Sequence, residues 1–296
     1  MGVKDLLRTI KKRIPSAVRP LARGGWPYLS HKTVAFDVPI LAYKYMSILS
    51  TRDPATLQKC MKDFARKCLR FHVDPIFVFD GKAPQAKAAE IARRQEAMRK
   101  AEAKGSYAMF HPSGEHFAAI RSAIESCGVP CVRASEEGEG ECAMLSRRGF
   151  CDVVVTNDSD SLAYLAREVV FQFDSSRAYA VHLDDVLTGM NGMSRETFVD
   201  YCVLMGTDNN PRIKGVGEAR LWADMVDRSG AQARNIEELI RCNQATSDAK
   251  FSPAALSEFM DSYKVARKIF LTGYEAESKA AMGACDADET CAWFDG

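Results

Sequence analysis

The stretch VVVTNDSD, residues 153–160, joins a run of β-branched residues to two closely spaced acids. Two other stretches share this design, VAFD at residues 34–37 and IFVFD at residues 76–80. Short apolar runs of this kind, separated by helix-forming stretches, are typical of buried strands in a mostly parallel sheet. The sequence therefore predicts an α/β fold in which helices flank a central sheet.

Helices are expected around these strands, because the intervals carry apolar residues at helical spacing or strong helix formers. They fall at residues 40–49, 55–71, 84–103, 115–126 and 141–148, and then, without further strands, at residues 195–205, 219–228, 236–242 and 253–272. The change of pattern predicts a boundary near residues 185–195. We therefore expect an α/β unit over residues 1–190, a helical region over residues 191–275 and a loosely ordered acidic tail over residues 276–296.

The composition limits the class of protein. With 296 residues, 47% hydrophobic and 27% charged, the chain can bury a core and is neither disordered nor fibrous. Its apolar runs are far shorter than the ~20 residues of a membrane helix, and the N-terminus lacks the apolar block of a signal peptide. No two of the 10 cysteines are separated by two residues, so we expect reduced thiols in an intracellular protein.

The net charge of +1 conceals an uneven layout. Residues 1–33 contain eight basic residues and one acid, whereas residues 275–296 contain six acids and one lysine. A basic segment in a nearly neutral chain indicates a polyanionic partner.

Acids follow each of the three predicted strands. Because the carboxyl ends of parallel strands share one edge of a sheet, we expect Asp37, Asp80, Asp158 and Asp160 to lie along that edge. For any one of these acids, a helix cap or a turn is the alternative interpretation. Four acids at one edge favour a carboxylate cluster.

The stretch SEEGEGE, residues 135–141, adds further carboxylates before a helix-forming stretch. Its glycines favour an extended turn, in which Glu137 and Glu139 face the same way, and Asp158 and Asp160 have the same spacing at a strand end. Carboxylates this close raise each other's pKa unless a cation neutralises them. Since histidines and suitably spaced cysteines are lacking nearby, oxygen ligation favours Mg²⁺ or Mn²⁺ over zinc.

Another acid, Asp208, ends the stretch LMGTD at residues 204–208, outside the strand pattern. It precedes IKGVG at residues 213–217, a Gly-x-Gly turn that opens a predicted helix. Such a turn presents backbone N–H groups to phosphate. An ordinary corner between two helices is the alternative.

Six stretches, taken in order, resemble the XPG group of structure-specific 5′ nucleases, which includes the flap endonucleases. They are MGVKDLL (1–7), FDVPILAY (36–43), VFDGKAPQAKAAEIARR (78–94), SEEGEGECAML (135–145), TNDSDSL (156–162) and FVDYCVLMGTDNNPRIKGVGEAR (198–220). The resemblance extends from residue 1 to about residue 227. It implies a PIN-like 5′ nuclease fold and a C-terminal helix-two-turn-helix DNA-binding region.

The resemblance also implies roles for individual residues. The metal-site carboxylates would be Asp37, Asp80, Glu137, Glu139, Asp158, Asp160 and Asp208. The catalytic lysine and arginine would be Lys87 and Arg94, which are close to two helical turns apart and so share one face. The DNA contacts would be Gly2, Lys4, Tyr43, Lys214, Gly215, Gly217 and Arg220. A solvated charge-rich helix and a core tyrosine are the plain alternatives for the stretch around Lys87 and for Tyr43.

The implied activity is that of a flap endonuclease with 5′–3′ exonuclease activity that uses two Mg²⁺ ions, for which Mn²⁺ can substitute, with K⁺ at the turn near Gly215. The implied partner is branched or nicked double-stranded DNA with a 5′ single strand, bound by a monomer. If the protein comes from a cellular organism, we expect it in the nucleus. If it comes from a virus, we expect it in the host nucleus or at a cytoplasmic replication site. The alternatives are a mainly exonucleolytic or junction-resolving enzyme of the group, and a DNA-structure binder that has lost catalysis.

The chain also departs from the family pattern. Residues 43–75 lack the acidic run that shapes a pocket for a one-nucleotide 3′ flap, and residues 95–113, within the expected helical arch at about 82–113, form a short segment. Gly138 replaces an alanine, which predicts a looser turn, and no sliding-clamp peptide is recognisable in the tail. This trimming is typical of a compact member, such as a viral one.

Overall fold

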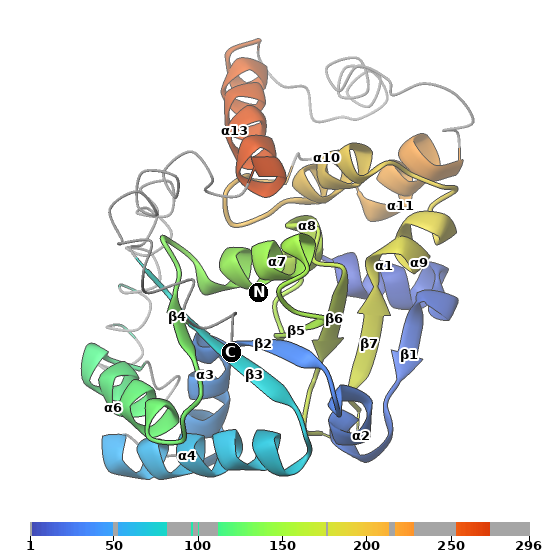
Figure 1. Ribbon diagram of the computed structural model, residues 1–296. Coiled ribbons are helices and arrows are strands. Elements are labelled where there is room, and N and C mark those ends of the chain that lie inside the picture. Colours follow the sequence, from blue (N-terminus) through green and yellow to red (C-terminus); the bar gives the residue numbers. More distant parts are fainter. Residues whose placement is uncertain are drawn as a thin grey trace.

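A seven-stranded sheet forms the centre of the computed structural model, which describes residues 2–49, 53–81, 96, 100, 112–175, 177–212, 217–227 and 253–272 (Figure 1). Its order is β1-β7-β6-β5-β2-β3-β4. The strands are β1 (Val18–Pro20), β2 (Thr33–Asp37), β3 (Asp74–Phe79), β4 (Cys131–Arg133), β5 (Val153–Val155), β6 (Glu168–Phe171) and β7 (Tyr179–His182).

Strands β4, β3, β2, β5 and β6 run parallel to one another, and β7 runs antiparallel to both β6 and β1. The mostly parallel sheet predicted from the sequence is therefore confirmed. In the register, Asp37 lies beside Val78 of β3, and Phe36 lies beside Val155 of β5. This pairing brings the carboxyl ends of the three predicted strands to one edge.

Eleven α-helices are assigned within the described residues. They are α1 (Leu6–Arg13), α2 (Trp26–Leu29), α3 (Val38–Leu49), α4 (Pro54–Arg70), α6 (Gly114–Glu125), α7 (Gly138–Arg148), α8 (Asp160–Ala163), α9 (Leu183–Gly189), α10 (Arg195–Met205), α11 (Glu218–Trp222) and α13 (Pro253–Thr272). Helices α10 and α13 have the predicted bounds, whereas the helices predicted at residues 84–103 and 236–242 lie outside the described residues, apart from Glu96 and Lys100.

Alternating strand residues contribute to two hydrophobic clusters, because successive side chains of a strand point to opposite faces. One cluster contains Phe36, Phe77 and Val155 with buried residues of α3, α4 and α6. Its aromatic rings are in contact, with the Phe36 and Phe64 centroids 5.3 Å apart. The other cluster contains Ala35 with buried residues of α1, α7, α10 and α13.

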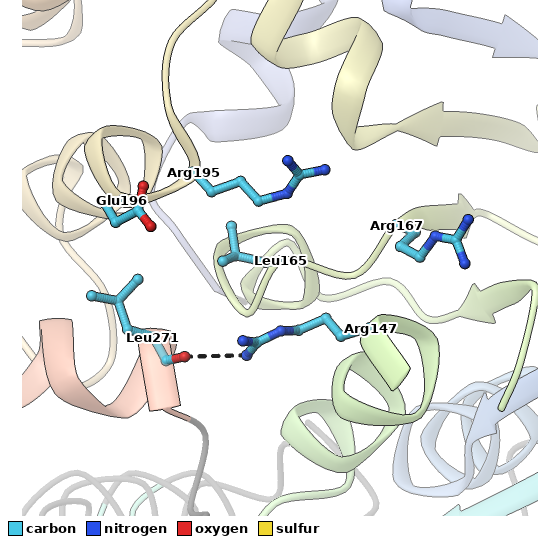
Figure 2. A pocket seen from close by; sticks show the side chains of 6 residues that line it. All are labelled: Arg147, Leu165, Arg167, Arg195, Glu196 and Leu271. Carbon is cyan, nitrogen blue, oxygen red and sulfur yellow. Dashed lines mark hydrogen bonds between the residues drawn. The ribbon is translucent and has the colours of Figure 1, made fainter. Parts of the chain in front are cut away.

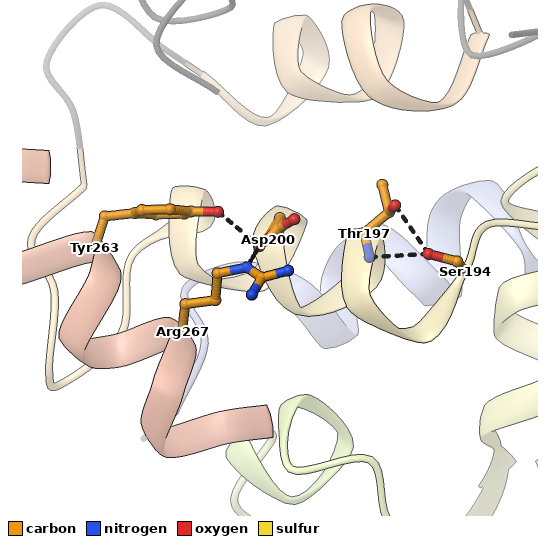
Figure 3. A network of polar contacts seen from close by, with 5 residues as sticks. All are labelled: Ser194, Thr197, Asp200, Tyr263 and Arg267. Carbon is orange, nitrogen blue, oxygen red and sulfur yellow. Dashed lines mark hydrogen bonds and ion pairs between the residues drawn. The ribbon is translucent and has the colours of Figure 1, made fainter. Parts of the chain in front are cut away.

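The second cluster extends across the boundary predicted at residues 185–195, since it joins Val154 and Leu162 to Phe198 of α10 and Phe270 of α13. A polar network also links these two helices (Figure 3). Asp200 of α10 accepts hydrogen bonds from Tyr263 and Arg267 of α13, each at 2.6 Å. In the described residues, α10 and α13 thus share one core with the α/β unit.

The basic N-terminal segment makes contacts inside the protein. Arg13 pairs with Glu218 of α11 at 2.6 Å and lies over the Trp222 ring, and Lys11 lies 3.8 Å above the centre of the Tyr179 ring. The seven cysteines among the described residues are free thiols. None of the described helices combines the length and apolar character needed to cross a membrane.

Candidate metal centre

The acidic edge of the sheet, as we call it, carries Asp37, Asp80, Glu137, Glu139, Asp158 and Asp160. Asp37 is the last residue of β2, and Asp80 follows β3 directly. The two glutamates lie at the start of α7, and the last two aspartates lie in the turn between β5 and α8. The expected gathering of acids at one edge is thus what the fold produces.

The prediction of an extended turn around Glu137 and Glu139 is wrong for one of them. Glu137 is the N-cap of α7 and has extended dihedrals (φ −98°, ψ 133°), but the helix begins at Gly138 and holds Glu139 in its first turn. The Gly138 N–H donates to Asp80 Oδ1 at 2.8 Å. Carboxylates are favourable at a helix N-terminus, where N–H groups lack intrahelical partners. This stabilisation favours a helix here over the extended turn that the glycines predict.

Asp158 and Asp160 also differ from the predicted strand end, because β5 stops at Val155 and α8 begins at Asp160. Their turn is held by hydrogen bonds. The Asp158 N–H donates to Thr156 Oγ1 at 3.1 Å, the Asp160 N–H donates to Asp158 Oδ1 at 3.1 Å, and Ser161 Oγ donates to the Asp158 carbonyl at 2.8 Å. All three hydrogen bonds are buried, so the turn holds the two carboxylates in fixed positions.

Within the described residues, ligand atoms of Glu139, Asp158 and Asp160 lie within 4.8 Å of one another. Asp160 is 1% exposed and Asp158 6% exposed. Three carboxylates from α7 and the β5–α8 turn thus converge in a protected place. All donors are oxygens, the type that Mg²⁺ and Mn²⁺ prefer.

The pKa of Asp37 indicates whether a bound cation would stabilise the acidic edge. The pKa of Asp37 is raised from 3.8 to about 8, mainly by burial and also by the charges of Asp80 and Asp158, while a hydrogen bond donated by Thr156 at 3.0 Å acts in the opposite direction. A cation would favour the ionised form of each acid. The residues therefore fit a divalent metal, in both donor type and charge.

The N-terminus closes one side of this site. Gly2 has a φ of +92°, and a Cβ there would lie 1.9 Å from Asp158 Oδ1 and 2.7 Å from Ser159 Oγ, so only glycine fits. Ser159 Oγ donates to the Val3 carbonyl at 3.2 Å. The position predicted for Gly2 as a DNA contact is thus directly beside the acids.

Asp208 lies in the loop after α10, outside the cluster of Glu139, Asp158 and Asp160. The Lys4 N–H donates to the Gly206 carbonyl at 3.0 Å, and Asn210 Nδ2 donates to the Val203 carbonyl at 3.2 Å. These bonds join the Asp208 loop to the N-terminal segment and to α10. Asp37, Asp80 and Glu137 likewise do not belong to the three-residue cluster.

The other predicted site residues are spread over several elements. Tyr43 is half-buried on α3 and Lys4 is exposed. Gly217 is the N-cap of α11, and Arg220 pairs with Asp224 at 3.9 Å. Four lie outside the described residues: Lys87, Arg94, Lys214 and Gly215.

A cavity away from the acidic edge is lined by Arg147, Leu165, Arg167, Arg195, Glu196 and Leu271 (Figure 2). Arg147 donates to the Leu271 carbonyl at 3.2 Å, and Arg195 pairs with Asp184 at 2.6 Å. The guanidinium groups of Arg147, Arg167 and Arg195 point in different directions in Figure 2. They do not converge on one anion, and the acidic edge remains the candidate site.

Sequence reasoning missed Thr156, whose hydroxyl contacts both Asp37 and the Asp158 turn. A threonine after a β-branched run is unremarkable as a signal, because it also suits a strand end. Its role depends on the register of β2 and β5.

Comparisons with known proteins identify relatives of this chain. The XPG N-terminal domain matches residues 1–101 and the XPG I-region matches residues 128–208. Flap endonuclease 1 of Entamoeba histolytica is 28% identical over 92% of this chain and 76% of its own length. The human flap endonuclease 1 is 27% identical over 81% of this chain and 69% of its own length.

Solved structures share the fold. The catalytic core of Rad2 in complex with DNA substrate has a TM-score of 0.66 at 18% identity, over 92% of this chain and 86% of that chain. The flap endonuclease-1 of Methanococcus jannaschii has a TM-score of 0.58 at 22% identity, over 86% of this chain and 81% of that chain. These structures show the fold. The two matched XPG regions, which contain all seven predicted metal-site acids, and the flap endonuclease relatives show that the chain belongs to the XPG family, the structure-specific 5′ nucleases that include the flap endonucleases.

Proposed function

We propose that this protein hydrolyses DNA phosphodiester bonds at 5′ flaps, with 5′–3′ exonuclease activity, by a mechanism that needs Mg²⁺. The observation that carries the proposal is the convergence of Glu139, Asp158 and Asp160 within 4.8 Å beside the buried Asp37. Acids gathered at one place repel each other when ionised, and a bound cation would relieve that repulsion.

Two ions at such an edge would activate water and hold the leaving 3′ oxygen. Asp37, Asp80, Glu137 and Glu139 are our proposed ligands for the first ion, and Asp158, Asp160 and Asp208 for the second. Mn²⁺ would substitute, since it accepts the same oxygen ligands. Lys87 and Arg94 are the proposed cations that stabilise the phosphate as negative charge develops on it.

The proposed DNA surface begins beside the acids and continues to α11. Gly2 and Lys4 lie next to the Asp158 turn and the Asp208 loop, and Tyr43 would stack on the base beside the scissile phosphate. At the other end, Gly217 and Arg220, with Lys214 and Gly215, would bind backbone phosphates, with K⁺ held at the same turn. These contacts carry no sequence information, so selection would depend on DNA shape.

The partner we propose is nicked or branched duplex DNA with a 5′ single strand, bound by one protein molecule. Affinity should fall steeply as salt rises, because phosphate contacts release counterions. The protein would act on DNA inside the cell, in the nucleus of a cellular source or at a replication site in a host.

A single gel tests the proposal. A labelled 5′-flap substrate, a nicked duplex and a four-way junction are incubated with the protein, with Mg²⁺ or with EDTA. We expect Mg²⁺-dependent endonucleolytic cutting near the flap base. Cutting of the nick or the junction alone would identify an exonuclease or a junction-resolving enzyme, and binding without cutting in Mg²⁺ would contradict the catalytic assignment.

A further inference from the structure

Thr156 connects two parts of the acidic edge through one side chain. It follows β5 directly and is 2% exposed. Its Oγ1 donates a hydrogen bond to Asp37 Oδ2 at 3.0 Å and accepts one from the Asp158 N–H at 3.1 Å. A hydroxyl has one proton to donate and lone pairs to accept, so both bonds can exist together.

The connection continues into the turn before α8. Asp158 Oδ1 accepts the Asp160 N–H at 3.1 Å, so the orientation of one aspartate depends on the backbone of the next. A continuous hydrogen-bonded path therefore runs from Asp37 on β2, through the Thr156 hydroxyl, to Asp158 and Asp160. Buried networks of this kind restrict the positions of their members, because each unmade bond is costly.

The path matters because the groups that it joins repel each other. Asp37 and the backbone of Asp158 bond to the same hydroxyl, so the two carboxylates lie close in the site and repel each other when both are ionised. Repulsion alone favours a wider separation. The Thr156 hydroxyl opposes this by bonding to the Asp37 carboxylate and to the backbone that carries Asp158.

We propose that Thr156 is a positioning residue whose hydroxyl sets the spacing between Asp37 and the turn of Asp158 and Asp160, and so tunes metal binding at the acidic edge. This inference rests on the proposed function. The competing interpretation is that Thr156 only fills space at the end of β5. The two differ in which part of the side chain matters, the hydroxyl or the bulk.

The test uses Thr156→Val, which keeps the shape and removes the hydroxyl, and Thr156→Ser, which keeps the hydroxyl and removes the methyl group. Binding of Mn²⁺ to the full-length protein is measured by titration calorimetry without DNA, and single-turnover cleavage is measured against Mg²⁺ concentration. We expect Thr156→Val to raise the Mn²⁺ dissociation constant and the half-maximal Mg²⁺ concentration by about 10- to 100-fold, the usual range for partners of metal ligands. Thr156→Ser should stay within about threefold of the wild type on the same scale.

Ser161→Ala is the matched control. It removes a buried hydroxyl that donates a hydrogen bond to the Asp158 carbonyl in the same turn and not to Asp37. We expect it to lower the melting temperature with a much smaller change in Mn²⁺ affinity. Thr156→Ala gives a second measurement of hydroxyl loss that does not depend on how valine packs.

Several outcomes would overturn the inference. Equal Mn²⁺ affinity in wild type and Thr156→Val would do so, as would a loss in Thr156→Ser as large as that in Thr156→Val. An equal loss in Ser161→Ala would mean that any damage to the turn weakens the site. If the wild-type protein itself neither binds Mn²⁺ nor cuts DNA, the proposed function fails first, and the two failures are thereby distinguished.

Discussion

The two edges of the parallel sheet treat their charged side chains in opposite ways. At the amino edge, Glu168 pairs with Lys32 at 3.7 Å and accepts a hydrogen bond from Tyr28. Asp152 accepts the Thr33 N–H at 2.9 Å, and Thr33 Oγ1 donates to Asp74 at 3.2 Å. At the acidic edge, by contrast, carboxylates face other carboxylates, as Glu139, Asp158 and Asp160 do.

The difference separates acids whose partners lie within the fold from the acids that we propose to bind a metal. At the amino edge, Glu168 is paired with the cation of Lys32, and Asp74 and Asp152 accept hydrogen bonds from Thr33. At the acidic edge, burial and the neighbouring charges of Asp80 and Asp158 together raise the pKa of Asp37 to about 8. An edge that remains under repulsion in the folded chain is a candidate for function, because native folds otherwise pair their buried charges.

The largest effect that we expect comes from removing a ligand. Asp158→Ala or Asp80→Ala should reduce cleavage by at least ~10³-fold and largely keep DNA binding, because these acids hold metal and not the duplex. Rates on a 5′-flap substrate in Mg²⁺ and binding in Ca²⁺ measure the two properties. Glu168→Gln at the amino edge is the matched control and should cut at the wild-type rate. If purified Asp158→Ala cuts DNA at the wild-type rate, the assignment of the acidic edge as the metal site is wrong.

The next effect concerns Lys87 and Arg94, the proposed catalytic cations. Lys87→Ala and Arg94→Ala should each slow single-turnover cleavage by about 10²-fold with little loss of affinity, since their interactions strengthen in the transition state. Arg93→Ala and Arg99→Ala, neighbours in the same stretch, serve as controls. If all four variants lose the same activity, the stretch is a general phosphate-binding surface.

A smaller effect should follow from Gly2→Ala, which tests whether the N-terminus constrains Asp158 at the acidic edge. The added Cβ would lie 1.9 Å from Asp158 Oδ1, and the φ of +92° disfavours any side chain. We expect about a tenfold rise in the half-maximal Mg²⁺ concentration, because strain of about 1–3 kcal/mol must be relieved by moving the turn. Gly192→Ala, which also has positive φ (+71°) but open space around it, controls for backbone strain alone. An unchanged Mg²⁺ response would mean that the N-terminus does not constrain Asp158.

The smallest effect is a pH-dependent change in stability. The folded-state pKa of Asp37 is raised from 3.8 to about 8, so its contribution to stability is present below pH 4 and is lost as pH rises towards 8. Asp37→Asn should therefore raise the melting temperature at pH 8 in EDTA by about 2–4 °C, a shift of about 1 kcal/mol. The gain should shrink at pH 5 and in saturating Mg²⁺.

Thermal melts of wild type and Asp37→Asn at pH 5 and pH 8 measure this effect. Glu168→Gln should behave in the opposite sense, with a lower melting temperature, because it loses its pairing with Lys32. A stabilising Glu168→Gln together with a destabilising Asp37→Asn would reverse the comparison between the two edges.

Much of the fold could be predicted because the decisive signals are local. Three of the central strands carry dense β-branched or aromatic runs, and α10 and α13 begin and end where the periodicity indicates. The strands β1, β4, β6 and β7 were not predicted. They have three or four residues each. The equally short β5 was predicted because it consists of three consecutive valines, and β1 and β4 have no such run of β-branched residues.

The sequence by itself determined the chemistry of the site, because acids that follow strand-like runs meet at one edge of any parallel sheet. Only the tertiary structure decided how those acids are held. Gly2 lies against the Asp158 turn although the two are far apart in the sequence. Thr156 bonds to Asp37 because β2 pairs with β5. The physical reason is that such contacts join residues far apart in the chain, and their geometry follows from strand register and packing, which no local pattern encodes.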